Sequence, residues 1–173
     1  REKLGGGDMS ERQQPFFGKY RGVVSDNRDP DHNGRVRVKV PDVFGDEECG
    51  WAQPCLPFAG DKMGFFAVPP VNSWVWVEFE CGDPEYPIWS GSRWEAPKEQ
   101  PPMPGAAQSD ADSVVLICTK GGMRIVLDDS SSGGITLETS GGQKLCLSDS
   151  GIVLDNGKGA KITLSNSTVS INS

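Results

Sequence analysis

The stretch GGITLETSGGQKLCLSDSGIVLD, residues 133–155, decides the fold of the last third of this chain. It holds three copies of a triplet in which a polar or small residue stands between two apolar ones: Ile135-Thr136-Leu137, Leu145-Cys146-Leu147 and Ile152-Val153-Leu154. Such alternation is typical of a β-strand with one buried face. The Gly, Ser and Asp residues between the copies indicate turns.

The triplet recurs outside this stretch, so that six copies start ten or seven residues apart. The other copies are Ile125-Val126-Leu127, Ile162-Thr163-Leu164 and Val169-Ser170-Ile171. Short strands at regular spacing, joined by glycine-rich turns, indicate a β-solenoid or a β-prism.

Strands this short cannot bury one apolar face within a single chain well enough to offset the entropy lost on ordering them. We expect further copies of the chain to supply both strand edges for hydrogen bonding and surface for packing, as an intertwined trimeric β-prism or β-helix needle. A one-chain solenoid is the alternative, although its coils usually run longer and more evenly. The residues expected to line the axis of the trimer are Ile125, Leu127, Ile135, Leu137, Leu145, Leu147, Ile152, Leu154, Ile162, Leu164, Val169 and Ile171.

A second strand-rich region precedes these repeats. We predict strands near residues 18–25, 35–40, 51–57, 64–68, 74–80 and 88–93. The run RVRVKV, residues 35–40, alternates strictly and places three valines on one face. Five or six strands in about eighty residues fit a small closed barrel of the OB type. The chain is therefore predicted to be all-β.

Composition divides the chain into four parts. Residues 1–15 are polar and are expected to form a flexible lead-in, and residues 16–95 form the predicted OB-fold domain with all five tryptophans. Residues 96–113, rich in Pro and Ala, form a linker, and residues 114–173 form the predicted β-prism spike.

Charge and apolar content argue against several classes of partner. The formal net charge of −7 argues against nucleic-acid binding and against attachment to anionic lipid. The sequence contains no run of 18 apolar residues, so it predicts no transmembrane helix. The polar first fifteen residues do not resemble a signal peptide, which predicts synthesis in the cytoplasm. The five cysteines are odd in number and so do not suggest a disulfide framework. We expect them to be reduced residues that contribute to packing.

Enzymatic and metal sites are not supported by the residue pattern. Asp29, Asp31, Asn33 and Gly34 match the first positions of a calcium loop, yet its last position is Val40 instead of Glu. A His-dependent catalytic site would depend on His32 alone. We therefore expect no catalytic residues, no metal and no cofactor.

The tryptophans allow two interpretations. They could form a stacking platform for bases or sugars, as in OB folds that bind oligomers. The acidic net charge instead favours tryptophans that fill the barrel and the contacts between barrels.

The order of motifs in the first two thirds resembles phage baseplate assembly protein V and the related VgrG proteins of type VI secretion. The motifs include FFGKYRGVV at 16–24, NRDP at 27–30, GRVRV at 34–38 and GWA at 50–52. The others are GFFAVPP at 64–70, WVWVEFE at 74–80, GDP at 82–84 and YPIWSG at 86–91. The segment from Lys120-Gly121-Gly122 to Asp128-Asp129 is similar to the start of the needle in these spikes.

This resemblance implies a homotrimeric structural spike, not an enzyme, at the centre of the baseplate of a contractile phage tail or related injection system. Contraction of the sheath would push it through the target envelope, so it would meet the membrane only mechanically. A hub protein is expected to join it to the tail tube, because no hub-like domain precedes the barrel. A PAAR-type tip protein is expected at Val169, Ser170, Ile171, Asn172 and Ser173. The alternatives are an OB-fold binding module for single-stranded nucleic acid or glycan, and a cell-wall hydrolase.

Overall fold

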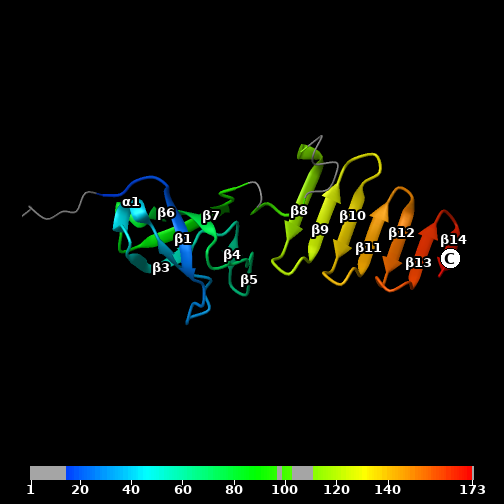
Figure 1. Cartoon of the computed structure of the whole chain (residues 1–173), viewed down its shortest axis with the longest axis horizontal. Coiled ribbons are helices and arrows are strands. Elements are labelled where there is room, and N and C mark those ends of the chain that lie inside the picture. The colour runs from blue at the N-terminus through cyan, green and yellow to red at the C-terminus, as the bar shows by residue number, and fades with distance from the viewer. Residues whose placement is uncertain (1–14, 97–98, 103–110, 173) are drawn as a thin grey trace, which may run out of the picture. The chain divides into compact units, whose positions relative to one another are not determined.

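The computed structural model describes residues 15–96, 99–102 and 111–172, and the chain divides into two compact units, 1–99 and 100–173 (Figure 1). In the described ranges, no helix has the length and apolar character needed to cross a membrane. The predicted all-β architecture is confirmed, since strands dominate both units.

The first unit contains a closed five-stranded barrel with strand order β1-β2-β3-β7-β6. Its strands are β1 (Tyr20–Asp26), β2 (Val36–Lys39), β3 (Glu48–Pro54), β6 (Trp74–Phe79) and β7 (Pro87–Arg93). β3 and β7 pair in parallel and all other neighbours are antiparallel. The predicted closed barrel is therefore confirmed.

The barrel interior is filled by small apolar side chains from alternating strand positions. In β2, Val36 and Val38 are fully buried while Arg37 and Lys39 are exposed, as strict alternation predicts. Val24, Ala52, Val75 and Val77 complete the centre. At one end, the ring of Phe79 lies 5.5–6.1 Å from the rings of Phe16, Tyr20 and Phe44.

Of the five tryptophans, Trp89 belongs to the buried core of the barrel, while the predicted role of the others in contacts between barrels stays a prediction. Trp89 is buried, Trp51, Trp74 and Trp76 are half-buried, and Trp94 is exposed. The guanidinium groups of Arg35 and Arg37 make cation–π contacts with Trp51, each 5.8 Å from its ring centroid. A five-stranded barrel packed with valines leaves little room for indole rings, so most of them lie outside it.

Two predicted strands of this unit differ from the structure. Residues 65–68 form no strand, and only the short hairpin β4 (Ala59–Gly60) and β5 (Met63–Gly64) occurs there. Phe65 and Phe66 are exposed, and the prolines that follow cannot donate to a ladder. β3 begins three residues before its predicted start, because Glu48 pairs with Lys39 across a register shift. The four-residue helix α1 (Pro41–Phe44) was not predicted.

The second unit is one antiparallel sheet in which seven strands follow one another in chain order. The strands are β8 (Val114–Cys118), β9 (Arg124–Asp128), β10 (Gly134–Glu138), β11 (Lys144–Ser148), β12 (Gly151–Asp155), β13 (Lys161–Ser165) and β14 (Thr168–Ile171). The six predicted triplets form β9 to β14. β8 is a seventh copy that the prediction missed.

Hydrogen bonding in this sheet corrects one expectation. Each of the strands β9 to β13 pairs on both sides with its neighbours in the same chain. Other copies are therefore not needed to supply edges for these strands. What the single chain leaves uncovered is the apolar face.

Candidate functional site: the apolar face of the C-terminal sheet

The register of the sheet aligns its apolar side chains in two straight rows on one face. Ile135 lies opposite Leu127 and Leu147, and Leu137 lies opposite Ile125 and Leu145. The same pairing continues to both ends of the sheet. The first row is Val115, Leu127, Ile135, Leu147, Ile152, Leu164 and Val169, and the second is Ile117, Ile125, Leu137, Leu145, Leu154, Ile162 and Ile171. We call these fourteen residues the apolar face.

The apolar face is open to solvent in the single chain. Thirteen of its fourteen side chains are exposed, from 37% for Leu147 to 68% for Ile171, and only Leu145 is half-buried. A contiguous apolar surface spread over seven strands is far larger than the scattered exposed residues of ordinary monomers. Apolar surfaces of this size mark sites of protein–protein interaction.

All twelve residues predicted for the axis lie on the apolar face. Sequence reasoning missed Val115 and Ile117 in β8, although Val115-Leu116-Ile117 is itself a triplet that starts ten residues before Ile125. The signal was present. The triplet lies within the continuous apolar run VVLIC, which shows no alternation of apolar and polar residues.

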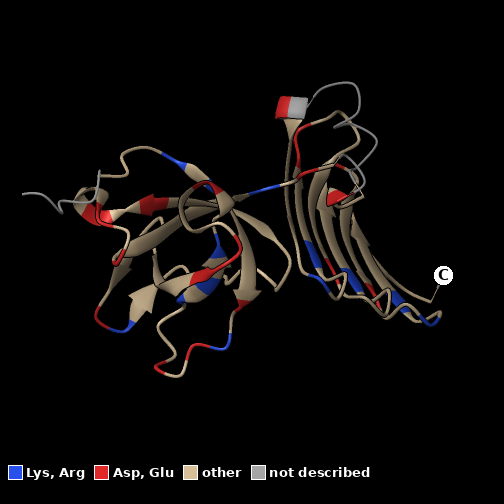
Figure 2. Ribbon diagram, turned by 60° about the vertical axis from the view of Figure 1, so that its left-hand side comes forward, with Lys and Arg blue, Asp and Glu red and all other residues tan. Residues whose placement is uncertain are grey.

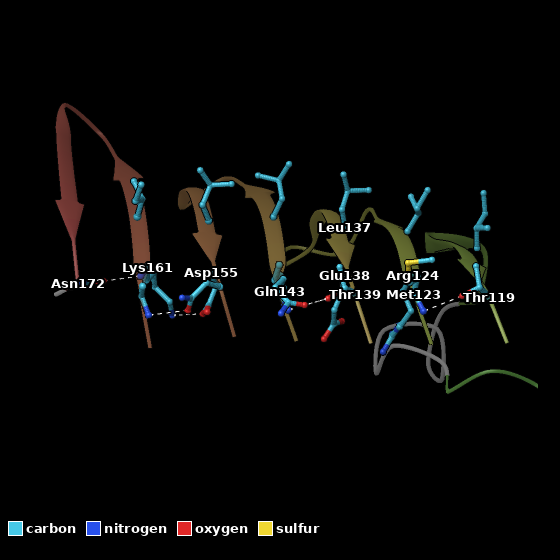
Figure 3. A pocket seen from close by; sticks show the side chains of 18 of the residues that line it. Thr119, Met123, Arg124, Leu137, Glu138, Thr139, Gln143, Asp155, Lys161 and Asn172 are labelled. Carbon is cyan, nitrogen blue, oxygen red and sulfur yellow. Dashed lines mark hydrogen bonds and ion pairs between the residues drawn. The ribbon is translucent and has the colours of Figure 1, made fainter. Parts of the chain in front are cut away.

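A groove of about 860 Å³ follows the second row of the apolar face (Figure 3). Apolar side chains such as Leu137 line one part of it, and polar residues at the strand ends, such as Glu138, line the other. The groove crosses the strands, from Ile117 in β8 to Ile171 in β14. A covering element would therefore contact every strand of the sheet.

Three five-residue loops, 119–123, 139–143 and 156–160, border this groove and share one construction. The first residue of each, Thr119, Thr139 or Asn156, donates its backbone N–H to the carbonyl oxygen of the fifth and accepts the N–H of the fifth on its side-chain oxygen. The loops also lie close together, since a Cβ on Gly157 would come within 2.8 Å of the Gly142 backbone. Side-chain capping and close backbone approach thus hold the strand ends in a regular row.

The residues predicted for the tip interface do not all lie on the same face of β14. Val169 and Ile171 belong to the apolar face, while Ser170 points to the opposite face of β14. Asn172 follows the strand, and its side chain accepts the N–H of Lys161 at 2.9 Å. Ser173 lies outside the described residues. In the described part of the chain, β14 pairs only with β13.

The loop that resembles a calcium site is organised around Asp29, the one buried charged residue in the described part of the chain. The carboxylate accepts the N–H groups of Asp31, Asn33 and Arg35 and the Arg35 guanidinium, whose closest nitrogen lies 2.6 Å away. The pKa of Asp29 is held far below its usual range, chiefly by the hydrogen bond from Arg35, while burial opposes this shift. The guanidinium group of Arg35 thus pairs with the carboxylates of Asp29 and Asp31, the residues that match the calcium loop. Among the described residues, no group of three or more His, Cys, Asp or Glu could hold a metal ion.

The cysteines only partly match their predicted packing role. All five are free thiols, Cys49 is buried, Cys118 and Cys146 are half-buried, and Cys55 and Cys81 are exposed. Burial raises the pKa of the Cys49 thiol. His32 lies in an exposed loop with φ 56°.

Comparison with known proteins matches each unit to a family. Residues 20–94 match the type VI secretion system/phage-baseplate injector OB domain. Residues 113–173 match the phage baseplate V C-terminal trimerisation domain. The second match, together with the uncovered apolar face, supports a homotrimer.

One curated relative is the actin cross-linking toxin VgrG1 of Vibrio cholerae serotype O1, which is 36% identical over 75 residues. The similarity covers 41% of this chain but only 7% of the relative. The chain therefore spans a small part of that much longer protein.

Proposed function

Because the chain belongs to the baseplate V and VgrG-like spike proteins, we propose that it is the trimeric central spike of a contractile phage tail or related injection system. Three copies turn their apolar faces inward and form a prism, whose needle is driven through the target envelope when the sheath contracts. The protein acts through rigidity and carries out no covalent chemistry.

The observation that supports this proposal most directly is the apolar face. Two unbroken rows of seven Ile, Leu and Val residues cross the sheet, and none of the fourteen positions is polar. Three such faces meeting around one axis would remove all of them from water, at about 25 cal/mol for each Å² of apolar surface buried. The twelve residues predicted for the axis, extended by Val115 and Ile117, form the proposed core.

Two protein partners complete the proposed assembly. A tip protein of the PAAR type covers the outer edge of β14 at Val169–Ser173, where strand pairing is one-sided among the described residues. A hub protein connects the barrel unit to the tail tube. The exposed apolar side chains of Phe58, Met63 and Phe66, at or near the β4–β5 hairpin, offer surface for protein contact.

Neighbouring residues on opposite faces of β10 provide the test. Leu137→Asp places three carboxylates in the proposed core, and we expect the full chain to lose its trimer in light scattering. Thr136→Asp introduces the same charge on the other face and should leave the trimer intact. A trimer that tolerates Leu137→Asp as well as Thr136→Asp would refute the proposed core.

A further inference from the structure

The charges of the C-terminal sheet are segregated to the two ends of its strands, and the two ends differ in sign. The positions between them, which include the apolar face, carry no charge. At the end formed by the five-residue loops lie Lys120, Arg124, Lys144, Lys158 and Lys161, against Glu138 and Asp155. We call this end the basic rim.

The opposite strand ends carry only acidic charges among the described residues. Asp128 ends β9, Asp129 and Asp149 lie in the turns that follow β9 and β11, and Asp112 precedes β8; no described Lys or Arg lies at this end. We call this end the acidic rim. Figure 2 shows the same division, with the sheet's blue segments at one end of the strands and red segments without blue at the other.

The sheet balances part of this charge itself, because Glu138 lies opposite Arg124 and Lys144, and Asp155 lies opposite Lys144 and Lys161. In the described part of the sheet, the one ion pair joins Lys161 and Asp155 at 3.2 Å within the basic rim. Lys144 is exposed and lies opposite Glu138 and Asp155 in the ladder, but it makes no close ion pair with either in the described sheet. Besides the hydrogen bond from the Gly157 N–H, the charge of Lys144 helps to lower the pKa of Asp155. Asp149 is exposed. Arg124 has a buried Nε without a hydrogen-bond partner in the described structure. Five cations against two carboxylates leave the basic rim with a net charge of +3, whereas the acidic rim carries only carboxylates. The two rims are therefore complementary in charge.

A trimer brings the two rims together by symmetry. A ring of three identical copies uses heterologous contacts, in which two different patches of the chain meet at every interface. When three sheets turn their apolar faces inward and their strands cross the prism faces, the strand ends meet at the corners. Each basic rim then faces the acidic rim of the next copy.

Equal height along the axis makes the pairing specific. In a prism whose strands run at right angles to its axis, the two ends of one strand lie at the same level, so the start of β11 in one copy faces the end of β11 in the next. Lys144 precedes and Asp149 follows the apolar positions of β11, and Arg124 and Asp129 flank those of β9 in the same way. Neighbouring strands lie about 4.8 Å apart, so a slip by one strand would separate these charges from their partners.

We propose that the basic rim of each copy binds the acidic rim of the next, with Lys144 facing Asp149 and Arg124 facing Asp129, and that these pairs guide the three chains into register. This inference rests on the proposed trimer and specifies how its corners close. The apolar face supplies the adhesion, while the rims supply orientation and speed of assembly, the usual contribution of complementary charge.

The test follows trimer assembly of the full chain by light scattering after dilution from urea, an uncharged denaturant. In 50 mM salt, we expect Lys144→Glu to slow assembly about tenfold relative to Lys39→Glu, which reverses an exposed charge on the barrel. Combining Lys144→Glu with Asp149→Lys restores opposite charges at each corner and should return the rate to within about twofold of wild type. In 500 mM salt, the difference between Lys144→Glu and Lys39→Glu should shrink, because the Debye length falls.

Three results would overturn the pairing while leaving the proposed trimer in place. They are equal rates for Lys144→Glu and Lys39→Glu, no recovery in the charge-swapped variant, and a defect that persists unchanged at high salt. If the wild-type chain forms no trimer, the proposed function fails and this inference fails with it.

Discussion

Gly151, the first residue of β12, lies so close to Leu164 of β13 that a Cβ at position 151 would stand 2.0 Å from the Leu164 carbonyl oxygen. Seventeen residues earlier, Gly134 has the same relation to Leu147 in β11, again at 2.0 Å. Both glycines have positive φ, 128° and 140°. The same close backbone contact therefore occurs at the start of β10 and again at the start of β12.

Gly151→Ala should therefore destabilise the sheet strongly. The added Cβ meets a backbone oxygen, which cannot rotate away, and alanine is disfavoured at positive φ. We expect the substitution to lower the free energy of unfolding of the second unit by at least about 2 kcal/mol, measured by urea denaturation of the full chain. Gly121→Ala is the control, because a Cβ there would meet nothing closer than 4.0 Å. Equal midpoints for the two variants would contradict this role of Gly151.

Asp29 should make the stability of the barrel depend on pH in the acid range. Its pKa in the folded chain is far below the value of about 3.9 in an unfolded chain. The stabilisation is therefore fully present above about pH 5 and is lost as the pH falls below 4. We expect Asp29→Asn to lower the melting temperature by more than about 5 °C at pH 7, with a gap to wild type that narrows toward pH 2.

The control for Asp29 is Asp61→Asn, in the exposed turn between β4 and β5. It should leave both the melting temperature and its acid dependence close to wild type. A gap between Asp29→Asn and wild type that stays constant from pH 7 to pH 2 would show that the carboxylate charge is not what holds the loop.

Trp89 connects the barrel wall to the loop that carries Asp29. Its buried indole Nε1 donates to the carbonyl oxygen of Gly34 at 3.1 Å. Trp89→Phe leaves this oxygen without its partner, at a cost of about 1–3 kcal/mol in unfolding free energy. Trp94→Phe changes a side chain that is 56% exposed and should stay within about 0.5 kcal/mol of wild type. Circular dichroism in urea would compare them, and a smaller loss for Trp89→Phe than for Trp94→Phe would contradict the role of the hydrogen bond.

Regular alternation made much of this fold predictable from sequence. The valines of residues 35–40 and the triplets from Ile125 to Ile171 each fix which side chains share a face, because the side-chain period of a strand is two. That period placed all twelve predicted axis residues on the apolar face before any pairing was known.

Sequence reasoning failed where apolar residues do not alternate or where tertiary contacts decide. Phe65 and Phe66 form an apolar pair that reads as a strand but lies exposed in a loop. Of the five tryptophans, Trp89 joins the buried core, and the valine-packed interior leaves little room for further indole rings. The opposite charges of the two rims were hidden in the sequence, because only the register of β8 to β14 shows which strand ends lie together.

The mass of the native assembly tests the central claim most directly. One chain has a mass of 18.6 kDa, so the account predicts a wild-type species of about 56 kDa, three times that value, in native mass spectrometry of the full chain. A single species at 18.6 kDa, with residues 114–172 protected from hydrogen exchange, would show that the apolar face needs no other copy and would contradict the trimeric spike.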